Sequence, residues 1–451
     1  MIRTIIMTKI GILPLAEEGH VFATFGLATK LQKYGYEIVY LGIADLKNLV
    51  ESRGFKFVTI LENEFPKNFK KEEIPKIYKY KFRFQKLQAW ASIFKKNFDF
   101  CLDQKTDIFL QKLSLDLIIV DILSPEFAIL SSRNNINTVI FSSLMPYHKS
   151  QFVAPATQFF VPDKSLQKQI SISFRWGLLY FLANLKSLLS LFVTGFSFRS
   201  SLKILASVSG FKLDKIDFNT TYGAKLDIPH LFLCPEEFDF PRTKEKNLYY
   251  VESLVIPENI ENKSISEKIY NQEKIVFCTL GSQGFQFKSH KQFFDTLIDI
   301  FSAKPDWHLV ISLGSLDNYL KIEDYRQYEN ISVYNWVCQL EILQSCSYMI
   351  THGGLGTVKE CLYYGVPMIC LPIQRDQFSN AARVIYHGVG LSTKMRNINK
   401  KKLINLISEM ENNNTFKINS FKMSKIFKQK ENQNISTELI QRFIQEKINN
   451  F

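Results

Sequence analysis

The sequence predicts an α/β protein made of two doubly wound domains, each a parallel sheet with helices on both faces. Short apolar runs rich in Val, Ile and Phe alternate with longer segments of helical periodicity, an order typical of parallel sheets. The 451 residues are enough for two domains of ordinary size. A polar, repeatedly charged stretch at 251–272 separates the two sets of strands and is assigned as a linker. The predicted domains are therefore 1–250 and 273–415, followed by a basic helical tail at 416–451.

The first domain opens with a strand-like run at Lys9–Leu15 and a loop at Ala16–Gly19. A helical pattern follows from Val21 to Tyr34 and stops at Gly35, as expected of a helix end. The stretch 63–100 is basic and aromatic, and 164–212 has a helical pattern. Further strands of this domain are expected at Glu37–Gly42, Phe55–Ile60, Asp116–Asp121, Asn137–Ser143 and Pro229–Cys234.

The second domain alternates more regularly. Helical patterns cover 290–304, 339–346, 357–364 and 377–387. In sheets of this kind, ligands bind beyond the carboxyl ends of the strands, so we expect the site there and in the space between the domains. The strands are expected at Lys274–Leu280, Trp307–Leu313, Ile331–Asn335, Tyr348–Thr351 and Met368–Pro372.

The formal net charge of +13, from 56 basic and 43 acidic side chains, is concentrated in three stretches. Lys67–Lys96 holds ten basic residues against two acidic ones, Lys164–Lys212 holds seven against none, and Lys394–Lys430 holds ten against two. The first stretch interleaves its lysines with aromatic residues, which suits a solvated surface, an anionic membrane contact or a nucleic-acid surface. Because the second stretch is also apolar, a peripheral membrane contact through Lys67–Lys96 and Lys164–Lys212 is favoured over nucleic acid, and no nucleic-acid partner is expected.

One apolar segment is long enough to cross a bilayer. Trp176–Ser197 has 22 residues, and Lys186 is its only charged one. A polar stripe of Ser187, Ser190 and Thr194 recurs at helical spacing opposite a face of leucines. A central lysine would also cost about 2.5–3.5 kcal/mol to insert. We therefore expect a helix of the core or of a ligand pocket, with contact to or entry into a membrane left open.

The cysteines and the start of the chain bear on compartment. Seven cysteines, an odd number without a Cys-x-x-Cys pair, lie mostly inside apolar runs. This favours buried thiols in a reducing compartment over a disulfide or zinc framework. Met1–Leu15 carries Arg3 and Lys9 and continues directly into a predicted strand, which is not the pattern of a signal peptide. A cytoplasmic protein is expected, with peripheral membrane association as an alternative.

The most informative motif is a glycine-rich turn in the second domain. A predicted strand is followed by His352-Gly-Gly-Leu-Gly356, with a helix expected from about Thr357. A helix N-terminus offers free N–H groups and a positive dipole end, which together bind anions. The side chains of His352 and Thr357 add donors, and Glu360, one turn further, can accept hydrogen bonds from ribose hydroxyls. Lys359 replaces the last glycine of the G-x-G-x-x-G fingerprint, so the turn taken alone also fits a tight connection without a ligand.

The motifs around this turn, in their order and spacing, resemble the donor-binding signature of nucleotide-sugar glycosyltransferases with the GT-B fold. Asn335-Trp-Val-Cys-Gln339 precedes the turn, and Gly365-Val-Pro367 and Asp376-Gln377 follow it. The family includes UDP-glycosyltransferases, bacterial macrolide-type enzymes, and carotenoid and sterol glucosyltransferases. The resemblance covers most of the second domain and the first 45 residues. It implies two Rossmann-like domains facing across a cleft, the first binding an acceptor and the second a nucleotide-sugar donor.

The resemblance also implies how the nucleoside and the sugar would be bound. Trp336 would stack on the uracil, Gln339 would contact the base or ribose, and Glu360 would hold the ribose. Asp376 and Gln377 would hydrogen-bond the sugar hydroxyls. Because glucose-using relatives show this Asp-Gln pair, UDP-glucose is the implied donor.

The diphosphate would be held by His352, Gly354 and Thr357. Ser282, after the first strand of the second domain, is similar to the family's second phosphate contact. The chain has no Asp-x-Asp pair of the kind that metal-dependent transferases use. The helix N-terminus, the imidazole and main-chain N–H groups would then stabilise the phosphate charge, so no metal and no other cofactor is expected.

A candidate catalytic pair lies in the first domain. His20 follows the first predicted strand, and a neutral imidazole there can take the proton of an acceptor hydroxyl, as the matching histidine of the family does. Asp121, at the end of its own strand, is at the matching place to orient the ring. A structural or solvated histidine and a helix-capping aspartate are the alternatives; together with the donor signature, the catalytic interpretation is favoured.

The sequence thus predicts an inverting glycosyltransferase that transfers a hexose, in the first instance glucose, from a UDP-sugar to a hydroxyl group, with His20 as general base. A hydrophobic small molecule or lipid is expected as acceptor, because the 164–206 region is apolar. Two alternatives stay open. A GT-B nucleotide-sugar epimerase would share the phosphate site without needing His20 and Asp121, and the charge suggests a non-enzymatic membrane- or nucleic-acid-binding protein.

Overall fold

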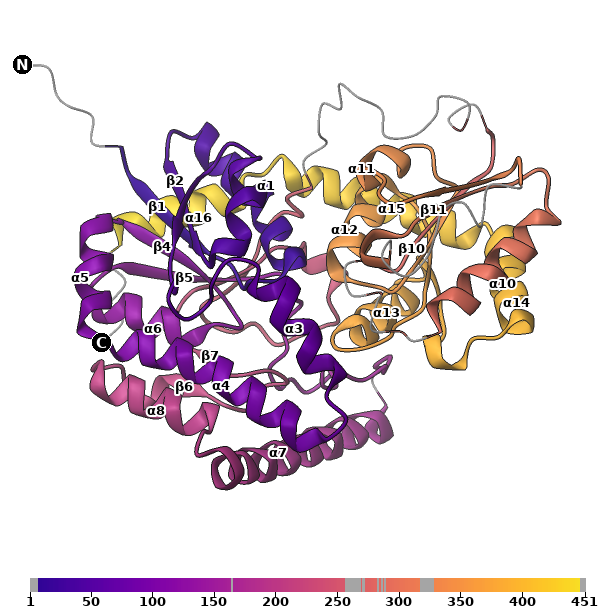
Figure 1. Cartoon of the computed structure of the whole chain (residues 1–451). Coiled ribbons are helices and arrows are strands. Elements are labelled where there is room, and N and C mark those ends of the chain that lie inside the picture. Colours follow the sequence, from indigo (N-terminus) through magenta and orange to yellow (C-terminus); the bar gives the residue numbers. More distant parts are fainter. Residues whose placement is uncertain are drawn as a thin grey trace, which may run out of the picture.

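The computed structural model describes residues 7–163, 165–255, 269, 272–281, 284, 287, 289–316 and 328–446. Two separate parallel sheets form, one in each half of the chain, with helices packed around them (Figure 1). This confirms the predicted class of two doubly wound α/β domains.

The N-terminal sheet has the strand order β3-β2-β1-β4-β5-β8-β9, with every pairing parallel. Its order reverses between β1 and β4, which lie side by side with Leu13 opposite Val120. A ligand-binding crevice is expected beyond the strand ends at such a reversal. A two-stranded antiparallel ribbon of β6 and β7 lies outside this sheet. The strands are β1 (Lys9–Leu13), β2 (Glu37–Gly42), β3 (Lys56–Thr59), β4 (Leu117–Asp121), β5 (Asn137–Ser142), β6 (Ile216–Asp217), β7 (Lys225–Leu226), β8 (His230–Phe232) and β9 (Leu248–Tyr250).

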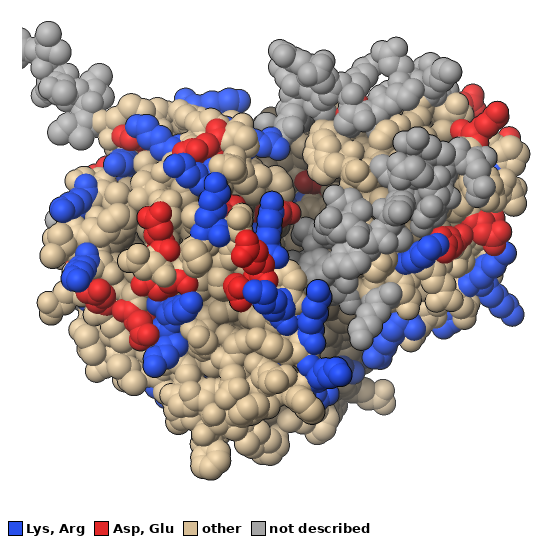
Figure 2. Space-filling view, viewed as in Figure 1, with Lys and Arg blue, Asp and Glu red and all other residues tan. Residues whose placement is uncertain are grey.

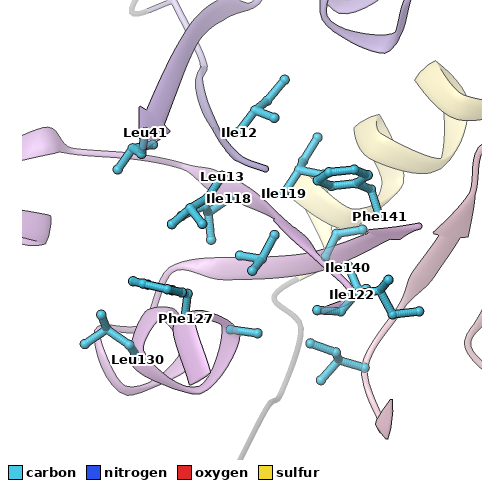
Figure 3. Close-up of a cluster of buried hydrophobic side chains, with 14 of the residues drawn as sticks. Ile12, Leu13, Leu41, Ile118, Ile119, Ile122, Phe127, Leu130, Ile140 and Phe141 are labelled. Carbon is cyan, nitrogen blue, oxygen red and sulfur yellow. The ribbon is translucent and has the colours of Figure 1, made fainter. Parts of the chain in front are cut away.

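The core of this half lies on both faces of the central strands. The side chains of β4 are buried along its whole length, as expected of a strand covered on both faces. Each fully buried aliphatic or Phe side chain contributes about 1.5–3 kcal/mol. Figure 3 shows the cluster beside helix α6, formed by Ile12, Leu13, Leu41, Ile118, Ile119, Ile122, Phe127, Leu130, Ile140 and Phe141.

Helices form at the two places expected in this half, near Val21–Tyr34 and within 164–212, and the further helices between them were not predicted. One difference matters for the site. The helix expected from Val21 begins at Glu18, because the turn after Leu15 is shorter than predicted, so His20 lies in the first helical turn. The helices are α1 (Glu18–Lys33), α2 (Lys47–Glu51), α3 (Phe69–Lys79), α4 (Arg83–Leu102), α5 (Gln104–Leu113), α6 (Pro125–Arg133), α7 (Leu166–Thr194) and α8 (Phe198–Val208).

The C-terminal sheet has the order β12-β11-β10-β13-β14-β15, again all parallel, and reverses between β10 and β13. Its strands are β10 (Ile275–Thr279), β11 (His308–Ser312), β12 (Ile331–Tyr334), β13 (Tyr348–Thr351), β14 (Met368–Cys370) and β15 (Gly390–Ser392). Its helices are α10 (His290–Ser302), α11 (Gln339–Ile342), α12 (Leu355–Tyr364), α13 (Gln377–Tyr386) and α14 (Lys400–Asn412).

Residues 416–446 of the segment assigned to a tail, 416–451, join the two halves. Helix α15 (Thr415–Glu431) packs against α12, and α16 (Ile435–Gln445) returns to the N-terminal half, where it contacts α1 and β5 (Figure 1). Leu439, Ile440 and Phe443 are buried in the N-terminal core. Of the predicted linker, 251–255, 269 and 272 are described, and 251–255 are buried beneath this crossing.

Helix α7 departs from the prediction of a core or pocket helix. Only Ile172 and Trp176 are buried, and most of its leucines and phenylalanines face solvent. Periodicity defined the two faces of this helix but not which one turns inward. Among the described helices, α7 is the one whose length and composition would allow it to cross a membrane.

Candidate active site

The first part of the site forms where β1 and β4 end side by side. His20 lies in the first turn of α1, directly after β1, and Asp121 is the last residue of β4. His20 Nδ1 lies 2.8 Å from Asp121 Oδ2, and both side chains are buried. The predicted pair is therefore brought into direct contact.

Asp121 is fixed by the backbone around it. Its Oδ2 accepts a hydrogen bond from Leu15 N at 3.2 Å, and its Oδ1 accepts one from Leu123 N at 2.9 Å. Because an ionised carboxylate only accepts hydrogen bonds, His20 donates through Nδ1–H, which leaves the lone pair on Nε2. The hydroxyl of Ser143 also lies 3.0 Å from Nδ1.

The electrostatic surroundings raise the pKa of His20. Burial alone lowers the pKa, but the adjacent Asp121 carboxylate outweighs it, and Glu17 and Asp376 add to the effect, so the pKa ends above the ordinary 6.5. Burial also raises the pKa of Asp376, while the positive charge of His20 acts in the opposite direction. Asp376 belongs to the C-terminal half, so the predicted sugar-binding carboxyl and the predicted base lie within electrostatic reach of each other.

The second part of the site forms where β10 and β13 end side by side. His352 follows β13, and its ring packs between Gly281, which follows β10, and Gly354. A Cβ at Gly281 would lie 2.5 Å from Cε1 of the ring, and one at Gly354 would lie 2.7 Å from Nε2. Burial lowers the pKa of His352 to about 4, so near pH 7 the ring is neutral and can serve as a hydrogen-bond donor.

Helix α12 begins at Leu355, two residues earlier than predicted, with Gly354 as its N-cap. Its first-turn N–H groups are those that the sequence predicted to bind an anion. Thr357 and Glu360 lie on this helix beside Gln339, the first residue of α11. Gln339 Nε2 donates to a carboxylate oxygen of Glu360 and lies 3.3 Å from Thr357 Oγ1.

The remaining donor residues are placed differently. Trp336 is 64% exposed in the loop between β12 and α11, so its indole is available for stacking. Asp376 Oδ2 accepts a hydrogen bond from Asn380 Nδ2 at 2.9 Å. Gln377 is buried, and its Oε1 accepts the main-chain N–H groups of Ile373 and Gln374 at 2.9 and 3.0 Å. The carbonyl end of Gln377 thus shapes its own loop, and its amide nitrogen is the end that can donate to a sugar.

Two contacts between the halves were not expected from the sequence. Arg375 Nη1 lies 2.9 Å from Glu17 Oε2, across the boundary between the halves. Lys359, whose side chain is buried, donates from Nζ to Leu233 O at 2.6 Å and to Ser253 O at 2.8 Å. Figure 2 shows the surface hollowed between the two halves. The only sequence signal for Arg375 was its position directly before Asp376.

Ser282, the predicted second phosphate contact, lies outside the described residues. Within the part of the chain that the structure describes, no group of three or more His, Cys, Asp or Glu residues is placed to hold a metal ion. The groups predicted to bind the donor and described by the structure include a helix N-terminus, a neutral imidazole, uncharged polar side chains and Glu360.

Comparison with known proteins identifies the family. The sequence model described as UDP-glucoronosyl and UDP-glucosyl transferase matches residues 12–436. The chain belongs to this family. Related UDP-glucosyl transferases include the uncharacterized UDP-glucosyltransferase YojK of Bacillus subtilis, 30% identical over 161 residues, or 36% of this chain. The oleandomycin glycosyltransferase of Streptomyces antibioticus is 33% identical over 123 residues, or 27% of this chain. The chain spans 38% and 27% of the lengths of these two relatives.

Solved structures extend the likeness over the whole fold of this family member. The glycotransferase of kitacinnamycin has a TM-score of 0.70 at 18% identity and covers 97% of this chain and 99% of its own. The calicheamicin glycosyltransferase CalG4 has a TM-score of 0.66 at 16% identity and covers 98% and 99%. The two-domain GT-B fold that the motifs implied is thereby confirmed.

Proposed function

We propose that the protein is an inverting glycosyltransferase that transfers a hexose, in the first instance glucose, from a UDP-sugar to a hydroxyl group of a hydrophobic small molecule or lipid. The observation that carries the proposal is the meeting of two strand-end sites. The His20–Asp121 pair lies at the reversal of one sheet, and His352 with the start of α12 lies at the reversal of the other. Asp376 contributes to the raised pKa of His20, which supports a proposed base close to the proposed sugar-binding carboxyl.

In the proposed reaction one proton is transferred, one bond forms and one bond breaks. The acceptor O–H gives its proton to Nε2 of His20, and the acceptor oxygen bonds to the anomeric carbon. The bond from that carbon to the β-phosphate oxygen breaks on the opposite face, and its electrons leave with UDP. Asp121 stabilises the imidazolium that forms, as a buried carboxylate does for a general-base histidine.

The donor would be held by uncharged and helix-derived groups. The N-terminus of α12, the His352 N–H and Thr357 face the diphosphate, Trp336 stacks on the base and Glu360 accepts from the ribose. A preorganised set of such donors stabilises a developing phosphate charge without a metal. No metal or other cofactor is part of the proposal.

The sequence suggested a hydrophobic acceptor because the 164–206 region is apolar, and the structure does not support this argument. Most apolar side chains of α7 face outward, and none of them lines either of the two described cavities. The relative named an oleandomycin glycosyltransferase supports a small-molecule acceptor.

The test combines transfer and binding measurements. The protein is incubated with UDP-glucose, UDP-galactose, UDP-glucuronic acid or dTDP-glucose and a panel of lipophilic alcohols. Products are read by mass spectrometry and the anomeric configuration by NMR. We expect a β-glucoside from UDP-α-glucose, and we expect His20→Ala to abolish it while UDP still raises the melting temperature. Turnover that survives in His20→Ala, or conversion of the sugar nucleotide without an acceptor as an epimerase would give, contradicts the proposal.

A further inference from the structure

Helix α7 presents an almost unbroken apolar face to solvent. Seven side chains three or four positions apart lie on this face, so they form one stripe along the helix. They are 43–90% exposed. The stripe consists of Ile170, Phe174, Leu178, Phe181, Leu185, Leu188 and Phe192.

The opposite face of α7 carries its polar side chains inward. Ser187 Oγ lies 2.7 Å from Ser197 Oγ, and Ser190 Oγ donates to Phe196 O at 2.9 Å. Thr194 Oγ1 donates to Ser190 O within the helix at 2.7 Å and lies 3.2 Å from Phe196 O in the turn. These bonds fasten α7 to the turn before α8, while Trp176 Nε1 anchors its first half to Val153 O at 2.8 Å. The orientation is the reverse of a surface helix in water, and the anchoring favours a helix that stays in the fold over one that leaves it to span a bilayer.

The stripe is large enough that a binding partner is expected to cover it. From Ile170 to Phe192 a helix runs about 33 Å at 1.5 Å per residue. Soluble monomers rarely expose a contiguous apolar patch of this extent without an interaction that covers it. Figure 2 shows the surface over α7, at the lower edge of the molecule, without charged side chains, and blue side chains above it.

Positive charge borders the stripe. Lys168, Arg175 and Lys186 fall on one edge of α7, and no acidic residue occurs from 165 to 212. Lys168 pairs with Asp163 just before the helix, at 2.8 Å. Long basic side chains beside an apolar helix face are the arrangement of helices that lie in the interface of an anionic membrane.

A cationic cavity continues this edge onto the C-terminal half. It has a volume of about 300 Å³ and shares Arg175 with α7. Lys394 and Arg396 line its other side, with Phe159 and Phe378 between them, and no acidic residue is among its described lining residues. Such a cavity suits a phosphate-bearing headgroup.

We propose that α7 docks the protein on an anionic membrane surface, lying in the plane of the bilayer with its apolar stripe at the acyl boundary and the cavity at Arg175, Lys394 and Arg396 facing the lipid headgroups. A second copy packed stripe to stripe and antiparallel fits less well, because it would bring the two basic edges together. The proposal stands apart from the transfer reaction and would hold for any activity of this chain.

The experiment is flotation of the purified full-length protein with vesicles of phosphatidylcholine alone or with about 30% phosphatidylglycerol. Three variants accompany the wild type. The stripe variant is Phe174→Ser/Phe181→Ser/Leu188→Ser, and the cation variant is Lys394→Gln/Arg396→Gln. The matched control replaces isoleucines that are 43–55% exposed on α5, α14 and α15: Ile108→Ser/Ile404→Ser/Ile418→Ser.

We expect the wild type and the control to float with the anionic vesicles. The stripe variant should bind at least about tenfold more weakly, since three apolar side chains no longer enter the bilayer. The cation variant should lose the preference for phosphatidylglycerol. The proposal is overturned if the wild type stays unbound, if the stripe variant floats as well as the control, or if sedimentation shows a dimer that only the stripe variant dissociates. All substituted stripe residues are mostly exposed, so unchanged thermal unfolding is the expected check on folding.

Discussion

Arg375 and Glu17 form an ion pair that links the two halves of the chain at the candidate active site, with 2.9 Å between Nη1 and Oε2. Glu17 lies three residues before His20, and Arg375 lies directly before Asp376. Both side chains are partly exposed, so the pair adds little to the free energy of unfolding, at most about 1 kcal/mol. Its consequence is positional, because it holds the segment with the proposed base against the loop with the proposed sugar-binding carboxyl.

The substitution Glu17→Gln tests whether the ion pair positions and charges the surroundings of His20. Glu17 raises the pKa of His20, so its loss should lower that pKa and move the acid limb of the kcat/KM–pH profile to lower pH. A loosened loop should also reduce the rate at pH 8 by about threefold to tenfold. Glu18→Gln, on the exposed next residue, is the control and should leave both quantities unchanged. A profile that does not move in Glu17→Gln would show that the pair is incidental.

Charge reversal distinguishes geometry from electrostatics at the same place. In Glu17→Arg/Arg375→Glu the ion pair can form again, so the rate at pH 8 should recover relative to either single variant. The acid limb should move further down, since a positive charge now lies near His20 and disfavours its protonated form. Kinetic pH profiles of the two single variants and the double variant decide this point, and no recovery in the double variant contradicts the positional role.

The pairing of His20 with Asp121 could be predicted from the sequence because His20 follows one predicted strand, Asp121 ends another, and both match positions of the resembling family. The contact between Glu17 and Arg375 could not, since 358 positions separate them and nothing in either segment specifies how the halves meet. Strands β9 and β15 were also not predicted, because three-residue edge strands carry too short a pattern. For α7, the sequence defined a polar and an apolar face, and only packing against α4 and hydrogen bonds to the turn before α8 decided that the polar one turns inward.

The space around His352 gives a sharply matched pair of substitutions. Gly354→Ala adds a methyl group 2.7 Å from Nε2 of the ring, at a φ of −62° that alanine adopts without strain. Displacing the imidazole should weaken UDP binding by about tenfold or more, the cost of a hydrogen bond to a charged group. Gly356→Ala, on the same helix with open space at its Cβ, should bind UDP as the wild type does. Isothermal titration with UDP measures both; equal affinities would remove His352 from the phosphate site.

The pH dependence of this binding follows from burial. The pKa of His352 is about 4, so the ring stays neutral from pH 6 to 8 and its protonation should not alter the affinity for UDP there.

Asp121→Asn tests the catalytic pair without changing its shape. The carboxylate is the chief group that raises the pKa of His20, so the variant should have a lower His20 pKa and no longer favour the Nδ1–H tautomer. We expect kcat to fall by about 10²–10⁴-fold, while the affinity for UDP is retained. Ser143→Ala, which removes the other group within 3.0 Å of Nδ1, should cost less than tenfold. A kcat for Asp121→Asn near that of the wild type would assign the aspartate a structural role.

Glu126 supplies a prediction about stability that is independent of catalysis. It lies in the first turn of α6 and is 1% exposed; its Oε1 accepts a hydrogen bond from Asn97 Nδ2 at 3.2 Å, and its Oε2 has no partner among the described residues. Burial raises the pKa of Glu126 to about 7, from an ordinary 4.5. Between these two values the folded protein holds a proton that the unfolded chain releases, so the free energy of unfolding should fall as pH rises from about 4.5 to about 7.

Glu126→Gln should remove this dependence, because the amide does not ionise. The cost of burying the amide is the same at each pH. The informative quantity is therefore how the difference in free energy of unfolding between the variant and the wild type changes with pH. The free energy of unfolding of the variant, relative to that of the wild type, should rise by about 2–3 kcal/mol from pH 5 to pH 8. This change follows from the rise of the pKa of Glu126 from 4.5 to about 7 on folding. Urea unfolding at both pH values measures it, with Glu72→Gln on the exposed face of α3 as control. A difference that is equal at pH 5 and pH 8 would mean that water or a rearranged side chain reaches Glu126 and keeps its carboxylate charged.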